Sequence, residues 1–240
     1  MSKSKRNGVD PQDMIEEYGA DTSRFYVMQA NPPTDTMLWS GQSVAGSFKF
    51  LRGLWTLVHE QVTPRIVTRY SEGELTTELK ALRLKLHKTI EKVADDYGRR
   101  LQFNTAIAAV RELLNLYETL KDKSPVARAV AQELLEDVVL LLAPIVPHSA
   151  TALWGELRPG TLLIDQPWPA VDASALVQDQ IELVVQVNGK LRGHIRVPAS
   201  ASKDHIEALA LKDEAVQRFV NGQTPKKVVV VPGRLVNVVV

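Results

Sequence analysis

The stretch LTTELKALRLKLHKTIEKVADDY at residues 75–97 places an apolar residue at every third or fourth position. At 3.6 residues per turn, this spacing gathers the apolar side chains on one face of an α-helix. They are Leu75, Leu79, Leu82, Leu86, Ile90, Val93 and Tyr97. A stripe of this width must be buried against partners, so the stretch predicts a long core helix in a helical domain.

Three similar stripes flank it. They are Val44, Phe48, Leu51, Trp55, Val58 and Val62; Ile107, Val110, Leu113, Leu114, Tyr117 and Leu120; and Val126, Val130, Leu134, Val138, Leu141 and Leu142. Pro144 and Pro147 interrupt the last run, and residues 148–157 predict a shorter final helix. Four long stripes predict a helix bundle, with these positions in its core rather than around a cofactor.

Two short helices are expected before the bundle. Asp10 and Pro11 provide an N-cap and a first helical residue, and Gly19 ends that helix. Asp21 is expected to cap the next helix, which NPP at 31–33 ends.

The period changes after the bundle. Residues 157–180 are rich in proline and glycine and predict an irregular crossing or linker. Residues 181–199 then alternate as in strands around an Asn188-Gly189 turn, and 226–240 predict a second hairpin about Pro232-Gly233. Ser202 is expected to cap one helix that runs to about Val220. The fold class is thus multidomain: a mainly α bundle, then a small α+β domain of ββαββ order.

Composition excludes several classes of site. The 240 residues contain no cysteine, and the five histidines show no metal-ligand spacing, so no metal site is expected. No Gly-rich phosphate loop or Ser-His-Asp signature is present, and no apolar run is long enough to span a bilayer. The net charge of +1 divides into about +4 over residues 181–240 and −3 before them. A polyanionic partner is therefore expected at the C-terminal quarter, and no membrane partner is expected.

The opening MSKSKR combines lysines, which can follow a polyphosphate, with serines that can donate hydrogen bonds to phosphate oxygens. Residues 1–40 resemble the segment that follows the catalytic fold in class I aminoacyl-tRNA synthetases. Met1-Ser2-Lys3-Ser4 is similar to the last four residues of their Lys-Met-Ser-Lys-Ser loop, whose first lysine would precede Met1. The run 19–24 and the double proline followed by Trp39 are also similar to the family pattern.

The resemblance extends over the chain. LLAPIVPHSATALW at 141–154 is similar to a motif of the helical anticodon-binding domain, and VQVNGKLRG with VPGRLVNVVV resembles the terminal domain of bacterial-type leucyl-tRNA synthetases. It implies three domains: 1–43, the signature loop and connecting helices; 44–175, the anticodon-binding-type bundle; and 176–240, a tRNA-contacting domain. It also implies that Lys3 contacts the ATP phosphates, with Ser2 and Ser4 in support. The candidate tRNA phosphate contacts are Lys190, Arg192, Arg196, Lys226, Lys227 and Arg234.

The same resemblance implies a cytoplasmic, monomeric ligase that uses leucine, ATP with Mg²⁺, and tRNA-Leu. Its nucleotide-binding sheet would lie before Met1, so the chain is expected to be part of a longer protein, to bind no cofactor and to be inactive alone. Three alternatives remain open: a free-standing tRNA-binding module, the equivalent part of a valyl-, isoleucyl- or methionyl-tRNA synthetase, and an unrelated helical interaction protein.

Overall fold

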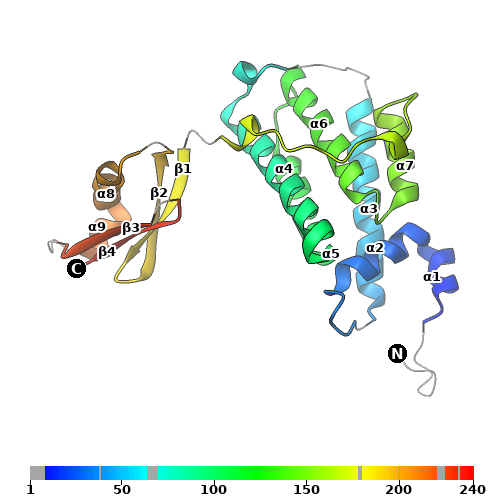
Figure 1. Cartoon of the computed structure of the whole chain (residues 1–240), viewed down its shortest axis with the longest axis horizontal. Helices are drawn as coiled ribbons and strands as arrows, with labels where there is room; N and C mark the ends of the chain where they lie inside the picture. Colours follow the sequence, from blue (N-terminus) through cyan, green and yellow to red (C-terminus); the bar gives the residue numbers. More distant parts are fainter. Residues whose placement is uncertain are drawn as a thin grey trace. The chain divides into compact units, whose positions relative to one another are not determined.

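The computed structural model describes residues 9–37, 39–63, 70–177, 180–199, 201–220, 225–231 and 233–240. The chain divides into two compact units, Met1–Leu176 and Val177–Val240. Figure 1 shows the first as helical and the second as a sheet with helices beside it. This confirms the predicted fold class, a mainly α part followed by a small α+β part.

The first unit consists of helices joined by short connections. Its α-helices are α1 (Pro11–Tyr18), α2 (Ala20–Ala30), α3 (Gly41–Val62), α4 (Thr77–Asp95), α5 (Phe103–Thr119), α6 (Pro125–Leu142) and α7 (Pro147–Leu157). Shorter turns are η2 (Glu72–Glu74), the π-turn η3 (Asp96–Arg100), η4 (Leu163–Asp165) and η5 (Ser174–Leu176). The four predicted long helices are therefore confirmed as α3 to α6, and the final shorter one as α7.

The core of this unit lies among α4, α5, α6 and their neighbours, because the apolar stripes face one another there. Leu86 of α4, Val110 and Leu113 of α5, and Leu134 and Val138 of α6 have no exposed surface. Burying a side chain of this size contributes about 1.5–3 kcal/mol relative to leaving it in water. The stripe that opens at Leu75 is thus the inner face of α4, as predicted.

The stripe of α3 departs from the prediction. Val44 and Val58 are buried, but the residues Phe48 and Trp55 remain 36% and 47% exposed. The turn between α1 and α2 and the start of α7 border these rings without covering them. A periodic pattern marks the apolar face of a helix, but it does not say how far the neighbouring elements extend over that face.

The short N-terminal helices begin and end where predicted, with one exception. The Gln12 backbone N–H donates to Asp10 Oδ1 at 2.9 Å, Pro11 is the first residue of α1, and α1 ends at Gly19, whose φ is +84°. That backbone conformation is nearly restricted to glycine. The expectation that Asp21 caps α2 is wrong, because α2 already begins at Ala20 and the Asp21 side chain reaches a different helix.

The segment after α7 is irregular, as predicted, but it packs on the bundle. The Trp168 ring lies 5.9 Å from that of Tyr97, and Asp172 forms an ion pair with Arg83 of α4. Ala175 in η5 is buried. Residues 158–176 therefore belong to the helical unit and form an ordered connection across its surface rather than a loose linker.

The second unit is a four-stranded sheet covered on one face by two helices. Its elements are β1 (Gln180–Val187), β2 (Lys190–Pro198), α8 (Lys203–Lys212), α9 (Glu214–Val220), β3 (Lys227–Val231) and β4 (Leu235–Val239). The strand order is β2-β1-β4-β3, with two antiparallel hairpins joined by the parallel pair β1 and β4. Asn188 and Gly189 have φ values of +49° and +76°, as the tight primed turn predicted there requires.

The helical segment of this unit differs in one respect from the prediction. The single helix predicted over 202–220 is two helices, because Asp213 adopts an extended conformation and its Oδ1 accepts from the Val216 backbone N–H at 3.1 Å, capping α9. Ser202 caps α8 as predicted. Leu183, Val185 and Val236 are fully buried on the face that α8 and α9 cover.

Candidate functional site

The predicted nucleotide-contacting residues Ser2, Lys3 and Ser4 lie outside the residues that the structure describes. Their proposed role stays a prediction. The structure does describe the segment that follows them, and the run 19–24 within it makes two contacts far along the chain.

Asp21 attaches this run to the first turn of α7, and Arg24 attaches it to the turn between α6 and α7. Asp21 Oδ2 accepts from the Ser149 backbone N–H at 2.5 Å, while Arg24 Nε and Nη2 donate to the carbonyls of Ile145 and Pro144 at 2.8 and 3.0 Å. α7 begins at Pro147 and has no side-chain cap of its own at Val146. Asp21 therefore acts as a tertiary N-cap for α7, placing negative charge at the positive end of its dipole.

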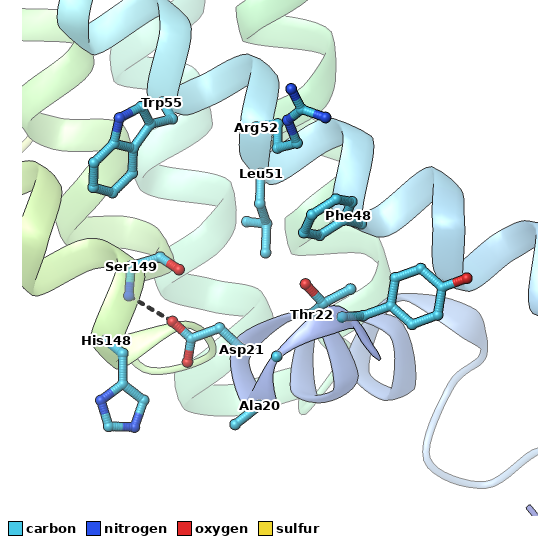
Figure 2. Close-up of a pocket in the computed structure, with 11 residues that line it drawn as sticks. Ala20, Asp21, Thr22, Phe48, Leu51, Arg52, Trp55, His148 and Ser149 are labelled. Atoms are coloured by element: carbon cyan, nitrogen blue, oxygen red, sulfur yellow. Dashed lines mark hydrogen bonds between the residues drawn. The ribbon is translucent and has the colours of Figure 1, made fainter. Parts of the chain in front are cut away.

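A pocket of about 400 Å³ lies beside this contact (Figure 2). The turn from Tyr18 to Thr22 forms one side, the α3 residues Phe48, Leu51, Arg52 and Trp55 another, and His148 and Ser149 a third. The Arg52 guanidinium is 5.9 Å from the centre of the Phe48 ring. Two partly exposed aromatic rings, one of them beside a cation, can contact a flat or anionic group. Sequence periodicity placed both rings in the core and so missed this pocket.

The predicted tRNA-contacting cations of the second unit are spread over several positions. Lys190 pairs with Val187, and Lys227 with Val239, so both lie at the end of the sheet where the Asn188-Gly189 turn is. Exposed Lys226 precedes Lys227. The strand register therefore brings these three lysines to one end of the sheet, on its two edge strands.

The three arginines occupy other places. Arg196 is near the opposite end of β2, its side chain is 78% exposed, and its Nε lies 3.5 Å from Glu182 Oε2. Arg234 is exposed in the turn before β4. Arg192 is half-buried, and its guanidinium carbon lies 3.8 Å from the centre of the Phe219 ring of α9. The six residues thus do not form one compact patch, and their contacts with RNA stay a prediction.

A polar cluster inside the helical unit was not foreseen. Arg83 of α4 bonds to Asp172 Oδ2 at 2.7 Å and to Glu133 Oε2 of α6 at 3.2 Å, and Tyr70 donates to the same Glu133 oxygen. His87 Nδ1 accepts from the Asp172 backbone N–H at 3.2 Å. A ring nitrogen that accepts carries no proton, so Nε2 bears it and faces Glu133 Oε1 at 3.3 Å.

This cluster shifts the pKa values of its carboxyl groups in opposite directions. Hydrogen bonds from Ser174 and Arg83 lower the pKa of Asp172 to about 2. Burial raises the pKa of Glu133, but hydrogen bonds from His87, Tyr70 and Arg83 outweigh burial and lower it. Burial, together with the nearby Glu133 charge, raises the pKa of Asp137 to about 7. The cluster is best explained as the anchor of residues 158–176 on the bundle.

One signal for the cluster exists in the sequence. Arg83 and His87 are four residues apart and lie on the same buried side of α4 as Leu79, Leu82 and Leu86. A cation on a buried face needs a partner. Nothing in the sequence indicates that the partners are Glu133 and Asp172.

Two other kinds of feature are absent from the described ranges. No group of three or more His, Cys, Asp or Glu side chains there is arranged to hold a metal ion. No helix in this part of the chain is both long and apolar enough to cross a bilayer.

Comparisons with known proteins agree with the resemblance found in the sequence. The family model "Anticodon-binding domain of tRNA ligase" matches residues 80–208, and "tRNA synthetases class I (I, L, M and V)" matches residues 1–39. Over all 240 residues the chain is 59% identical to the leucine–tRNA ligase of Laribacter hongkongensis and 57% identical to that of Chromobacterium violaceum. It covers 27% and 28% of their lengths, and so spans less than a third of these curated relatives.

A solved structure shows the same fold over the whole chain. It is the crystal structure of a LeuRS–tRNA–LeuAMS ternary complex from Agrobacterium radiobacter K84, which matches with a TM-score of 0.86 and 26% identity. The match covers 100% of this chain and 31% of that one. With the family model covering more than half of its residues, the chain belongs to the family of anticodon-binding domains of tRNA ligases.

Proposed function

We propose that the chain is the tRNA-binding part of a leucine–tRNA ligase, which attaches leucine to tRNA-Leu through an ATP-derived leucyl adenylate. The observation that carries this proposal is the match of the entire chain, at 51–59% identity, to leucine–tRNA ligases from several bacteria. The agreement extends through both structural units, including the terminal domain.

The two units would have different tasks. The bundle of the helical unit, joined through Asp21 and Arg24 to the segment that resembles the end of the catalytic module, would hold the tRNA body relative to the reaction site. The second unit would contact the RNA backbone through its excess of cations. ATP, Mg²⁺ and leucine would be bound only in the longer protein, where Lys3 would contact the ATP phosphates. The enzyme would be a cytoplasmic monomer.

Two other functions are weaker. The class I family model that matches residues 1–39 covers the isoleucine, leucine, methionine and valine enzymes together, so that stretch alone does not choose among them. The whole-chain matches favour the leucine enzyme. A free-standing tRNA-binding module would explain both units, but it gives no role to the attached class I segment.

The test is tRNA selectivity, measured by fluorescence anisotropy with the 240-residue chain. Labelled tRNA-Leu should bind more tightly than tRNA-Val, tRNA-Ile or tRNA-Met at the same salt concentration. Equal affinity for all four would contradict the leucine assignment. The same preparation should show no leucine-dependent pyrophosphate–ATP exchange, because adenylate formation requires the carboxylate and the α-phosphate to be positioned in one site.

A further inference from the structure

Arg192 lies at a β-bulge between β1 and β2. Val185 pairs with Gly193 and Gln186 with Leu191, so Arg192 is the extra residue of β2 at this point. A bulge redirects a side chain away from the regular alternation of the strand. Here it directs Arg192 to Phe219 of α9, on the side of the sheet that the helices cover.

The neighbouring glycine permits this arrangement. A Cβ at Gly193 would lie 3.1 Å from Asp213 Oδ1 and 3.7 Å from Ala215 Cβ, closer than an ordinary contact in the first case. The short approach keeps the beginning of α9 against β2. It therefore fixes the distance between Phe219, later in α9, and the bulged Arg192.

The guanidinium of Arg192 is stacked but not neutralised. Its carbon is 3.8 Å from the centre of the Phe219 ring, whereas its Nε is buried and has no hydrogen-bond partner. Among the described residues no carboxylate forms an ion pair with it. Asp213, on the adjoining turn, accepts from the Val216 N–H instead. Phe219 itself remains 48% exposed, so the pair lies at the surface.

We propose that Phe219 is a positioning residue that holds Arg192 flat for a bidentate contact with one phosphate of the tRNA backbone. The inference rests on the proposed tRNA-binding function. Stacking restricts the long side chain before binding, so less conformational freedom is lost when the contact forms. A planar guanidinium donates two parallel hydrogen bonds to a phosphate, a geometry that a lysine cannot reproduce.

The first experiment compares arginine variants of the full 240-residue chain by anisotropy with tRNA-Leu between 50 and 200 mM salt. Arg192→Ala should raise the dissociation constant about tenfold and reduce the slope of log affinity against log salt by about one. Arg192→Lys should keep the salt slope and still lose about threefold or more in affinity. Arg218→Ala is the matched control, because Arg218 is an exposed arginine of α9 that is not among the predicted tRNA contacts, and its replacement removes the same charge.

The second experiment isolates the role of Phe219. Phe219→Leu keeps the charge of Arg192, so it should leave the salt slope unchanged and weaken binding about two- to fivefold, as expected for loss of an exposed cation–π interaction. Phe219→Tyr keeps an aromatic ring beside Arg192 and should bind tRNA-Leu as tightly as the parent chain does. In the Arg192→Ala background, Phe219→Leu should have no further effect. Thermal unfolding of each variant reports whether the fold is intact.

Either of two results would overturn the inference. One is that Arg192→Ala binds no more weakly than Arg218→Ala, and the other is that Phe219→Leu weakens binding equally with and without Arg192. The Lys226→Glu/Lys227→Glu variant separates this failure from a failure of the proposed function. If that variant loses affinity while the Arg192 and Phe219 variants do not, the second unit still binds tRNA. If every variant binds as the parent chain does, both proposals are wrong for this unit.

Discussion

Asp21 accepts a hydrogen bond from the backbone N–H of Ser149, although the two residues are 128 positions apart in the chain. Arg24, one turn further along α2, donates to the carbonyls of Pro144 and Ile145 in the turn between α6 and α7. The acid thus compensates the start of α7, and the base satisfies two carbonyls of the turn that precedes it. The segment that resembles the end of a catalytic module is thereby joined to the bundle by charge-assisted hydrogen bonds as well as by packing.

Removing this tertiary cap should destabilise the helical unit. We expect Asp21→Ala to lower the free energy of unfolding by about 1 kcal/mol, the usual cost of losing a helix N-cap. Asp21→Asn should cost less, because its amide oxygen can still accept from Ser149. Urea denaturation measures both. Glu156→Ala on the exposed side of α7 is the control and should stay within about 0.5 kcal/mol of the parent. Equal effects at positions 21 and 156 would contradict the capping role.

The Arg83–Glu133 pair allows a comparison between a buried and an exposed ion pair. Glu133→Gln should lower the free energy of unfolding by about 2–3 kcal/mol, because Arg83, His87 and Tyr70 all lose a charged acceptor. Glu112→Gln breaks the Lys85–Glu112 pair, whose carboxylate is 66% exposed, and should cost less than about 1 kcal/mol. Chemical denaturation of the parent chain and the two variants measures both losses in free energy of unfolding. Similar losses would mean that the buried cluster does not anchor residues 158–176.

Asp137 should make the stability of the helical unit fall as the pH rises from about 4 to 7. Its pKa is raised from 3.8 to about 7 in the folded chain by burial and by Glu133, so the folded state keeps a proton that the unfolded state has lost. Ionisation thus favours unfolding across this window, and the penalty is constant above it. Asp137→Asn removes the titration. Its advantage over the parent in free energy of unfolding should grow by at most about 1.4 kcal/mol per pH unit. If the free energies of unfolding of the parent and Asp137→Asn change in parallel between about pH 4 and 7, the raised pKa of Asp137 is contradicted.

The sequence was informative wherever one local rule decides the structure. The apolar stripes of α4, α5 and α6 have a single period and a single consequence, burial, and all three lie in the core. Asp10 with Pro11, and Asn188 with Gly189, are local signals that act on the next one to three residues. These features were predicted from the residues alone, because the partners that complete them are adjacent in the chain.

The rest depends on contacts between distant segments. An aspartate near the start of a helix is expected to cap that same helix, and only the fold shows that Asp21 caps α7 instead. The α3 stripe does not tell how far its neighbours extend, so Phe48 and Trp55 were assigned to the core. The pairing of Arg192 with Phe219 requires both a bulge and the break between α8 and α9. Neither of these has a sequence rule as strong as the helical period.

The lysines at the end of the sheet provide the most direct test of where RNA binds. Lys226→Glu/Lys227→Glu reverses two exposed charges next to the last strand while leaving its buried residues, Val236 and Val238, untouched. Binding of tRNA-Leu should weaken, and the slope of log affinity against log salt should become shallower by about two, one for each phosphate that the variant no longer neutralises. Lys203→Glu is the control on α8, where the lysine already lies 3.7 Å from Glu207, so its replacement should change the slope less. Salt screens every exposed charge. If the slope of log affinity against log salt becomes equally shallow in the Lys226→Glu/Lys227→Glu and Lys203→Glu variants, the effect is one of net charge and not of position. If the salt dependence becomes shallower only in the Lys226→Glu/Lys227→Glu variant, tRNA phosphates lie at the Asn188–Gly189 end of the sheet.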